Sequence, residues 1–175
     1  MSSPHPPILC FVGRSNSGKT TLIERLIPVL VREGYRIATI KHAGHGFDLD
    51  TEGKDSWRLK QAGAKTVIVT SKGSLAMFAD VDNEVRVEEL RERYVHDGTD
   101  LIIAEGWKSE GYPKVVVVRD HVGEVEVLPE GLLALVSNKP LERVPGSVPV
   151  FHPDDISGLA SLIGERFPLR RGPRA

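Results

Sequence analysis

A glycine-rich segment carries the first recognisable chemistry of this 175-residue chain. Residues Gly13 to Thr20 (GRSNSGKT) match the pattern G-x-x-x-x-G-K-[ST] in full. In such a loop, successive backbone amides point inward and form an anion-binding nest. The lysine reaches the β- and γ-phosphates, and the last hydroxyl ligates Mg²⁺. The segment therefore predicts a site for the phosphates of a nucleoside triphosphate.

The residues expected to contact the nucleotide lie in and just after this loop. Gly13 lets the chain turn sharply, and Gly18 leaves room for phosphate oxygens where a Cβ would obstruct them. A helix that begins near Lys19 adds the positive end of its dipole. Thr20 is the candidate magnesium ligand. The predicted nucleotide-binding residues of the loop are Gly13, Asn16, Ser17, Gly18, Lys19, Thr20 and Thr21.

A carboxylate at the end of a second apolar run is the candidate partner of the metal. Glu105 ends the run Leu101 to Ala104, so it is expected at the carboxyl edge of a sheet, where ligands of open α/β folds bind. There it could hold a metal-bound water or position an attacking water, and we count it as a catalytic and metal-side candidate. The other interpretation is an ordinary solvated glutamate.

The polar loop Lys41 to Lys54 follows another apolar run and is expected at the same edge. Such a loop could order around a γ-phosphate and its Mg²⁺. Lys41 and His42 are candidate phosphate or substrate contacts. Asp48 is a candidate catalytic carboxylate that orients water, and Asp50 a candidate metal-side group.

Zinc binding is a competing interpretation of the same loop. His42 and His45 lie close in sequence and have carboxylates nearby. A structural zinc site requires four well-spaced ligands, and the single cysteine, Cys10, lies in a different apolar run. Two solvent-facing histidines are the simplest alternative.

The elements that must position these groups alternate between strand and helix. The apolar runs predict strands, and the 3.6-residue pattern after the glycine-rich loop predicts a helix. Pro28 lies inside this helix and is expected to kink it or to unsettle one turn. This succession predicts a three-layer α/β domain of the P-loop NTPase type with a mostly parallel sheet. Expected strands are 8–12, 35–40, 101–104, 115–118 and 132–136, expected helices 20–33, 55–62, 87–96 and one from Asp154 or Asp155 to 167, and 66–70 with 75–79 is expected to form an added β-hairpin.

Composition fits a single soluble domain. Hydrophobic residues make up 40% and charged residues 27%, and the formal net charge is −1, so neither nucleic acid nor a membrane is expected as a partner. With one cysteine and no apolar leader, the chain is expected to be cytoplasmic. We expect a flexible leader over 1–7, one domain over 8–167 and a flexible basic tail over 168–175.

A series of motifs resembles one known family, that of the molybdopterin-guanine dinucleotide biosynthesis protein B (MobB). The phosphate loop alone is generic, but the later motifs are specific when they occur together and in order. The resemblance covers about residues 8 to 120 and rests on GRSNSGKTTL at 13–22, KH at 41–42, FDLD at 47–50, GKDS at 53–56, AGA at 62–64, EGWK at 105–108 and PK at 113–114.

The resemblance implies a GTP-binding protein with weak, Mg²⁺-dependent GTPase activity. It also implies a homodimer that assists the guanylyltransferase joining GMP to molybdopterin, with molybdopterin itself as a further candidate ligand. By position, it implies nucleotide contacts at Gly13 to Thr21 and metal-side roles for Thr20, Glu105 and Asp50. Lys41, His42, Asp48, Lys54, Asp55 and Arg58 would line the working face, although the last three also fit a helix cap and an exposed ion pair.

One departure leaves the identity of the base open. Many P-loop GTPases recognise guanine with Asn-Lys-x-Asp after a late strand. This chain has Asn138 and Lys139, but Leu141 stands where the aspartate would be. The residues themselves therefore do not decide between guanine and adenine.

Two other functions remain open, as do the roles of several apolar residues. A P-loop small-molecule kinase would use the same loop, but no arginine-rich lid follows a late strand. A metallochaperone NTPase would use His42 and His45.

Trp57 is expected in the core, whereas Trp107 could stack on a pterin or base or simply pack. The hairpin over 66–79 is the candidate dimer surface, because exposed strand edges pair readily.

Overall fold

The computed structural model describes residues 5–44, 46–47, 50–119, 129–141, 144 and 146–169. These residues divide into two units. The first contains the chain up to His42 and from Val87 onward, and the second is Ala43–Arg86. Of the predicted site residues, His45 and Asp48 lie outside the described part of the chain.

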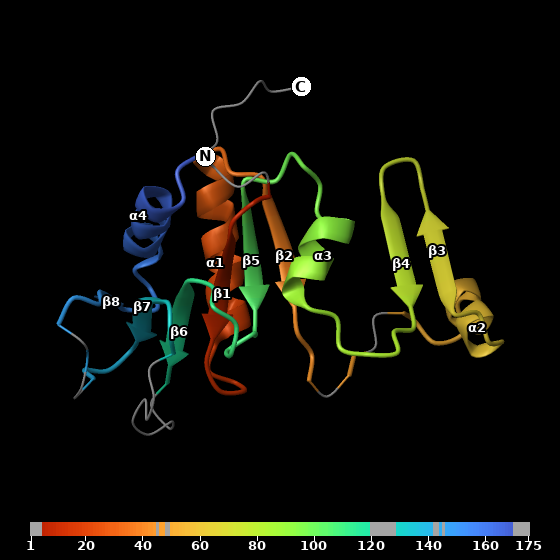
Figure 1. Ribbon diagram of the computed structural model, residues 1–175, viewed down its shortest axis with the longest axis horizontal. Helices are drawn as coiled ribbons and strands as arrows, with labels where there is room; N and C mark the ends of the chain where they lie inside the picture. The colour runs from red at the N-terminus through yellow and green to blue at the C-terminus, as the bar shows by residue number, and fades with distance from the viewer. Residues whose placement is uncertain are drawn as a thin grey trace. The chain divides into compact units, whose positions relative to one another are not determined.

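The first unit is built on a six-stranded sheet in the order β2-β5-β1-β6-β7-β8 (Figure 1). Every neighbouring pair is parallel. The mostly parallel sheet predicted from the apolar runs is therefore confirmed. β8 was not predicted, because two residues are too short to give a hydrophobic pattern. The strands are β1 (Ile8–Val12), β2 (Ile37–Lys41), β5 (Leu101–Glu105), β6 (Lys114–Val118), β7 (Leu132–Ser137) and β8 (Val150–Phe151).

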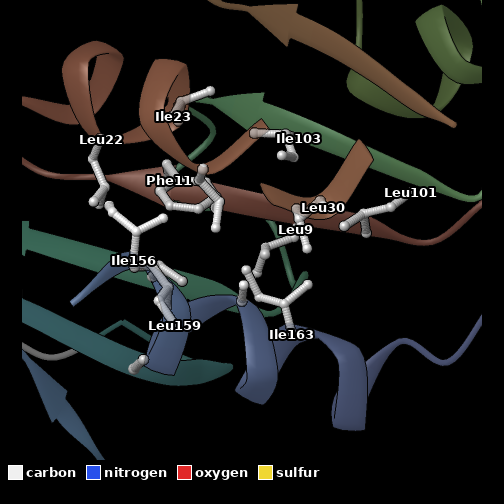
Figure 2. Packing of buried hydrophobic residues seen from close by; sticks show 14 of the residues in the cluster. Leu9, Phe11, Leu22, Ile23, Leu30, Leu101, Ile103, Ile156, Leu159 and Ile163 are labelled. Carbon is white, nitrogen blue, oxygen red and sulfur yellow. The ribbon is translucent and has the colours of Figure 1, made fainter. Parts of the chain in front are cut away.

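Both faces of this sheet are buried, because its strands are apolar on both sides. Alternate residues of the central strands separate into two buried clusters, as the pleat requires. One cluster joins Leu9 and Phe11 of β1 to α1 (Lys19–Arg32) and α4 (Ile156–Arg166), as Figure 2 shows. The other lies on the opposite face, with α3 (Val87–Tyr94) at its margin. The predicted three layers are thus present.

Helix α1 continues through Pro28 without a break. Proline removes the hydrogen bond to the carbonyl four residues earlier, that of Glu24. Glu24 and Pro28 both lie on the exposed side of the helix, so water can take the place of the missing donor. Leu22, Leu26 and Leu30 anchor the opposite side in the core. The helix therefore keeps its turns at Pro28, and the expected kink there stays a prediction.

The second unit contains one short helix and the predicted hairpin. Strands β3 (Thr66–Thr70) and β4 (Leu75–Ala79) pair antiparallel and have the predicted bounds. Helix α2 (Asp55–Gln61) buries none of its residues, so the expectation that Trp57 lies in the core is wrong. Asp55 is the first helical residue rather than the cap, which is Lys54.

Candidate functional site

Polar or charged groups lie at the carboxyl ends of all six parallel strands, at one edge of the sheet. Parallel strands place all their carboxyl ends at the same edge, which is where open α/β sheets bind ligands. This edge carries the phosphate loop after β1 together with Lys41, Glu105, Arg119, Asn138 and the segment His152–Asp154.

The phosphate loop turns sharply as it leaves β1. At Gly13 (φ 152°), an added Cβ would lie 2.4 Å from the carbonyl oxygen of Val117 on β6, so the chain can pass only without a side chain. Asn16 and Gly18 have left-handed backbone conformations, with φ of 61° and 89°. Gly18 then caps α1. The amide-rich turn therefore opens directly into the helix N-terminus, an arrangement that favours anions.

Ser17 is a buried residue of this loop. It is 2% exposed, and its Oγ is buried without a hydrogen-bond partner. A buried hydroxyl in this condition costs free energy unless something bonds to it. An oxygen-rich ligand in the loop would satisfy it.

The side chain of Lys19 reaches back to the start of the phosphate loop. Its Nζ donates to the carbonyl oxygens of Gly13 at 3.1 Å and Arg14 at 2.7 Å. Burial lowers the pKa of the Lys19 ammonium, while the Glu105 carboxylate raises it and the Lys41 ammonium lowers it further. A bound polyphosphate would offset this lowering of the pKa, because it would place negative charge beside the ammonium.

Thr20, Lys41 and Glu105 meet on one side of the loop. Thr20 Oγ1 donates to Glu105 Oε2 at 2.8 Å, and Lys41 Nζ lies 3.4 Å from each of these two oxygens. The meeting follows from the strand order, because Lys41 and Glu105 are register partners on β2 and β5, and Glu105 is also paired with Phe11 on β1. A hydroxyl and a carboxylate are oxygen ligands of the kind that Mg²⁺ prefers.

His42 and Trp107 lie together beyond Glu105. The His42 amide donates to the Glu105 carbonyl oxygen at 3.0 Å, and the two aromatic rings are 5.5 Å apart and tilted by 51°. Gly106 (φ 119°), which precedes Trp107, approaches His42 so closely that an added Cβ would lie 2.9 Å from the His42 Cβ. Trp107 has a φ of 54°, which is costly for a bulky residue. The EGW segment is thus shaped to hold His42 against the tryptophan.

Asp50 belongs to the second unit. Its Oδ1 accepts hydrogen bonds from the Thr51 amide at 2.9 Å and from Ser56 Oγ at 3.1 Å. These bonds fix the turn that leads into α2. The proximity of Asp50 to Thr20 and Glu105 stays a prediction.

On the other side of the phosphate loop is a pocket of about 350 Å³. Thr21, expected from the sequence to contact the nucleotide, lines it together with Ser17 and Gly18. The opposite part of its lining comes from the carboxyl ends of the outer strands and includes Asn138 and Asp154. Its volume falls within the roughly 300–1,000 Å³ of ordinary small-molecule sites.

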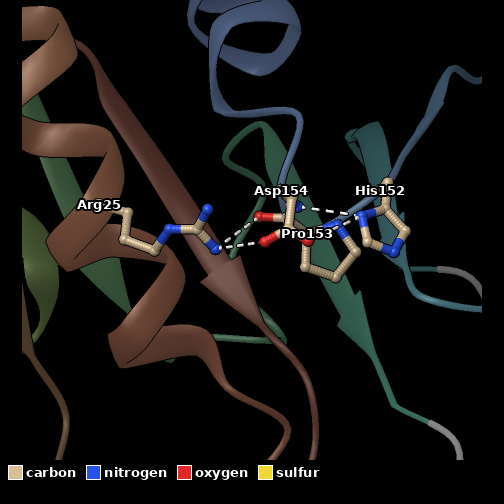
Figure 3. Close-up of polar contacts among 4 residues, drawn as sticks. All are labelled: Arg25, His152, Pro153 and Asp154. Atoms are coloured by element: carbon tan, nitrogen blue, oxygen red, sulfur yellow. Dashed lines mark hydrogen bonds and ion pairs between the residues drawn. The ribbon is translucent and has the colours of Figure 1, made fainter.

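Two arginines of this pocket had no motif to mark them in the sequence. Arg119 follows β6, and its guanidinium lies so close to Gly18 that an added Cβ there would be 3.1 Å from Nη2. Arg25 of α1 donates through Nη1 to Asp154 Oδ1 at 2.9 Å and to the Pro153 carbonyl oxygen at 3.2 Å (Figure 3). Arg119 thus places positive charge beside the phosphate loop, whereas the charge of Arg25 is paired with Asp154.

Comparison with known proteins identifies the family. The family model of the molybdopterin guanine dinucleotide synthesis protein B (MobB) matches residues 8–138. The chain belongs to the MobB family. It is 39% identical over 137 residues to the molybdopterin-guanine dinucleotide biosynthesis adapter protein of Haemophilus influenzae, covering 78% of this chain and 77% of that protein. It is 36% identical over 171 residues to the Escherichia coli protein of the same name, covering 95% and 96%.

A solved MobB structure has the same fold. The crystal structure of Bacillus subtilis MobB superposes with a TM-score of 0.75 at 32% identity, covering 95% of this chain and 99% of that one. The resemblance inferred from the sequence motifs is therefore confirmed. The matched family segment contains the phosphate loop, Lys41 and Glu105, and it ends at Asn138, so the segment His152–Asp154 lies beyond it.

The part of this MobB-family chain that the structure describes lacks two features. No group of three or more histidine, cysteine, aspartate or glutamate side chains among them is arranged to hold a metal ion. No helix in the same part of the chain is long and apolar enough to cross a membrane.

Proposed function

We propose that this chain is a GTP-binding adapter of molybdopterin guanine dinucleotide biosynthesis that assists the guanylyltransferase. The observation that carries the proposal is the meeting of Thr20, Lys41 and Glu105 beside a complete phosphate loop. The names of the related proteins supply the pathway, since each is called an adapter protein of that biosynthesis.

GTP with Mg²⁺ fits the groups at the carboxyl edge. The unpartnered Ser17 hydroxyl and the loop amides are suited to phosphate oxygens, and Lys19 would hold the β- and γ-phosphates. Thr20 and Glu105 would hold the Mg²⁺ ion, directly or through its waters, and the ion would neutralise charge on the phosphates. Lys41 would approach the γ-phosphate, with His42 beside it.

Slow hydrolysis is the activity we assign to this site. Glu105 is engaged by the Thr20 hydroxyl and by Lys41, so its carboxylate is shared rather than directed at one attacking water. Asp48 keeps the role predicted from the sequence, a candidate for orienting water, and Asp50 keeps the metal-side role that the family resemblance implies. A shared carboxylate is suited to a slow GTPase whose bound nucleotide reports a state to a partner.

Retention of the transferase on the tagged chain tests the proposal. We expect the guanylyltransferase to be retained with GTP and Mg²⁺, and less with GDP or no nucleotide. Lys19→Ala removes the charged donor to the phosphates, so triphosphate affinity is expected to fall about 100-fold and retention to fall with it. Glu165→Gln, on the exposed side of α4, is the matched surface control.

Two results would contradict the adapter assignment. The first is a transferase that is retained equally in every nucleotide state and with Lys19→Ala. The second is tight binding of ATP but not GTP, with a phosphorylated small molecule accumulating, which is the result expected of a kinase.

We also propose that the chain forms a homodimer through the β3–β4 hairpin. Ile68 and Met77 are register partners and so share one face of the hairpin with Leu75. The three side chains are 58%, 40% and 69% exposed. An apolar face with open strand edges is suited to a second copy of itself.

Light scattering after size-exclusion chromatography tests the dimer. Wild type is expected at twice the 19.2 kDa chain mass and Met77→Glu at the monomer mass, because a charge would be buried at the interface. Val31→Glu, on the exposed side of α1, also replaces an exposed apolar side chain by glutamate but away from the hairpin, and this variant should remain dimeric. A monomeric wild type, or a dimeric Met77→Glu, would exclude this surface.

A further inference from the structure

The pocket beside the phosphate loop lies on the side away from the metal-side cluster. Thr20 bonds to Glu105 on one side of the loop, whereas Thr21 lines the pocket on the other. In a phosphate loop, the residue after the metal-binding hydroxyl is placed near the α-phosphate, from which the nucleoside extends. The pocket is therefore positioned for a ribose and base once the loop holds the phosphates.

Two polar side chains with complementary chemistry lie in the far part of this pocket. Asn138 directly follows β7, and the turn that carries it is fixed by the buried Ser137, whose Oγ donates to the Lys139 carbonyl oxygen at 2.8 Å and accepts from the Lys139 amide at 3.2 Å. Asp154 comes from the segment after β8, the next strand of the sheet. The pocket thus combines an amide and a carboxylate supplied by neighbouring strands.

Arg25 holds the Asp154 segment against α1. Besides its bond to Asp154 Oδ1, it donates to the Pro153 carbonyl oxygen, so both the side chain and the backbone of the segment are fixed (Figure 3). Asp154 Oδ2 lies 3.4 Å from His152 Nδ1. An ionised carboxylate has about four acceptor positions, so these contacts leave room for two further donors. The Asp154 side chain is 70% exposed and open to a ligand.

We propose that Asp154 is the residue that selects guanine in this site, with Asn138 beside it and Arg25 as its positioning residue. The inference rests on the proposed GTP binding and goes beyond it by naming the group that reads the base. It also accounts for Leu141, which stands where the familiar guanine-reading motif would have its aspartate. The guanine-reading carboxylate would come instead from Asp154, which follows β8, the next strand of the sheet.

The chemistry of the two purines explains the choice. Guanine presents two donors side by side, N1–H and the 2-amino group, and a carboxylate accepts from both. Adenine presents an acceptor at N1, so its lone pair would face the negative carboxylate. Such a mismatch leaves a polar group unpaired, which selects strongly between otherwise similar ligands. The Asn138 amide would donate to the O6 or N7 acceptors of guanine.

Nucleotide titrations of wild type and Asp154→Asn test this assignment. Wild type should bind GTP more tightly than ITP, which lacks the 2-amino group, and far more tightly than ATP or XTP. In Asp154→Asn, GTP affinity should fall about 10- to 100-fold and the difference between GTP and ITP should disappear. XTP affinity should rise about tenfold or more, because the new amide donates to the 2-oxo group of xanthine.

A gain of XTP binding cannot come from a misfolded variant, so it protects the test against loss of structure. Asp155→Asn is the matched control. Asp155 caps α4 by accepting from the Gly158 amide at 2.9 Å, asparagine caps equally well, and Asp155 does not line the pocket. This variant should keep the wild-type nucleotide preference.

Failure of the inference is distinguishable from failure of the proposed function. If wild type prefers GTP and Asp154→Asn keeps that preference without gaining XTP, GTP binding stands and Asp154 is not the base-reading residue. If wild type binds ATP as tightly as GTP, both fail. Arg25→Ala provides a second readout: GTP affinity should fall several-fold, while affinity for XTP should change little.

Discussion

The Thr20 hydroxyl donates to the Glu105 carboxylate at 2.8 Å, although the two residues are 85 positions apart. Neighbouring parallel strands produce this contact, because β1 leads into the phosphate loop and β5 ends at Glu105. The same oxygen of Glu105 also faces Lys41. The contact therefore couples the candidate metal ligand of the loop to the carboxylate that our proposal assigns to the metal side.

Glu105→Gln should weaken the effect of Mg²⁺ on GTP binding. Glutamine keeps the shape of glutamate but removes the charge that attracts the ion and its waters. We expect the ratio of GTP dissociation constants measured without and with Mg²⁺ to fall about tenfold. Isothermal titration calorimetry with and without the metal measures it. An unchanged ratio would remove Glu105 from the metal side.

Arg119→Ala should lower affinity for GTP and GDP by the same factor. The Arg119 guanidinium lies against Gly18 on the pocket side of the loop, away from Glu105, so its charge should act mainly on the inner phosphates. A loss of about tenfold is expected for both nucleotides, and Arg119→Lys should restore part of it. Arg32→Ala, at the far end of α1, is the surface control. A loss confined to GTP would place Arg119 at the γ-phosphate instead.

The sequence predicts the groups that follow strong local patterns. The phosphate loop, Glu105 and Lys41 each come directly after an apolar run, and parallel pairing brings such ends to one edge. The hairpin was predicted with its observed bounds because two β-rich runs flank a short polar turn.

Other parts of the site depend on long-range order that no local pattern contains. Asp154 reaches the pocket because β8 is placed beside β7, and β8 is too short to be seen in the sequence. Arg119 has no motif, and only the fold brings it near the loop. Arg25 is close to the loop in sequence, but only the fold brings its partner Asp154 to it. Trp57 was expected in the core on its residue type alone, but α2 is a short surface helix with no buried residue.

Lys114→Met should destabilise the protein strongly. Lys114 is completely buried, and its ammonium donates to the carbonyl oxygens of Glu110, of Tyr112 at 3.0 Å and of Glu130 at 2.9 Å. Methionine fills a similar volume but leaves these three acceptors without a donor. We expect the free energy of unfolding to fall by about 3 kcal/mol or more, measured by urea denaturation. The exposed Lys108→Met should change it little.

The strand pattern did not reveal this buried charge, because the apolar run starts at Val115 and a lysine before it looks like a solvated strand end. If Lys114→Met were as stable as wild type, the three carbonyl oxygens would have to find water, and the residue would not be the internal support that the geometry indicates.

Cys10 should resist thiol reagents in the folded protein. It lies at the centre of β1 and is 0% exposed. Burial raises the pKa of its thiol to about 11, with the Lys114 ammonium opposing the rise. Relative to the unfolded value of 9.0, this leaves about a hundredfold less thiolate at pH 8. Labelling with a chromogenic disulfide should therefore be slow in buffer and fast in urea.

The same shift predicts how stability depends on pH. The folded pKa lies above the unfolded one, so the contribution of the neutral Cys10 thiol is complete below about pH 9 and is lost as the pH rises from 9 towards 11. Cys10→Ala removes this titration, so the alkaline fall in the free energy of unfolding should be shallower in the variant. Equal slopes for the two proteins would mean that the pKa of the thiol is not raised. Native labelling as fast as labelling in urea would mean that the thiol is accessible.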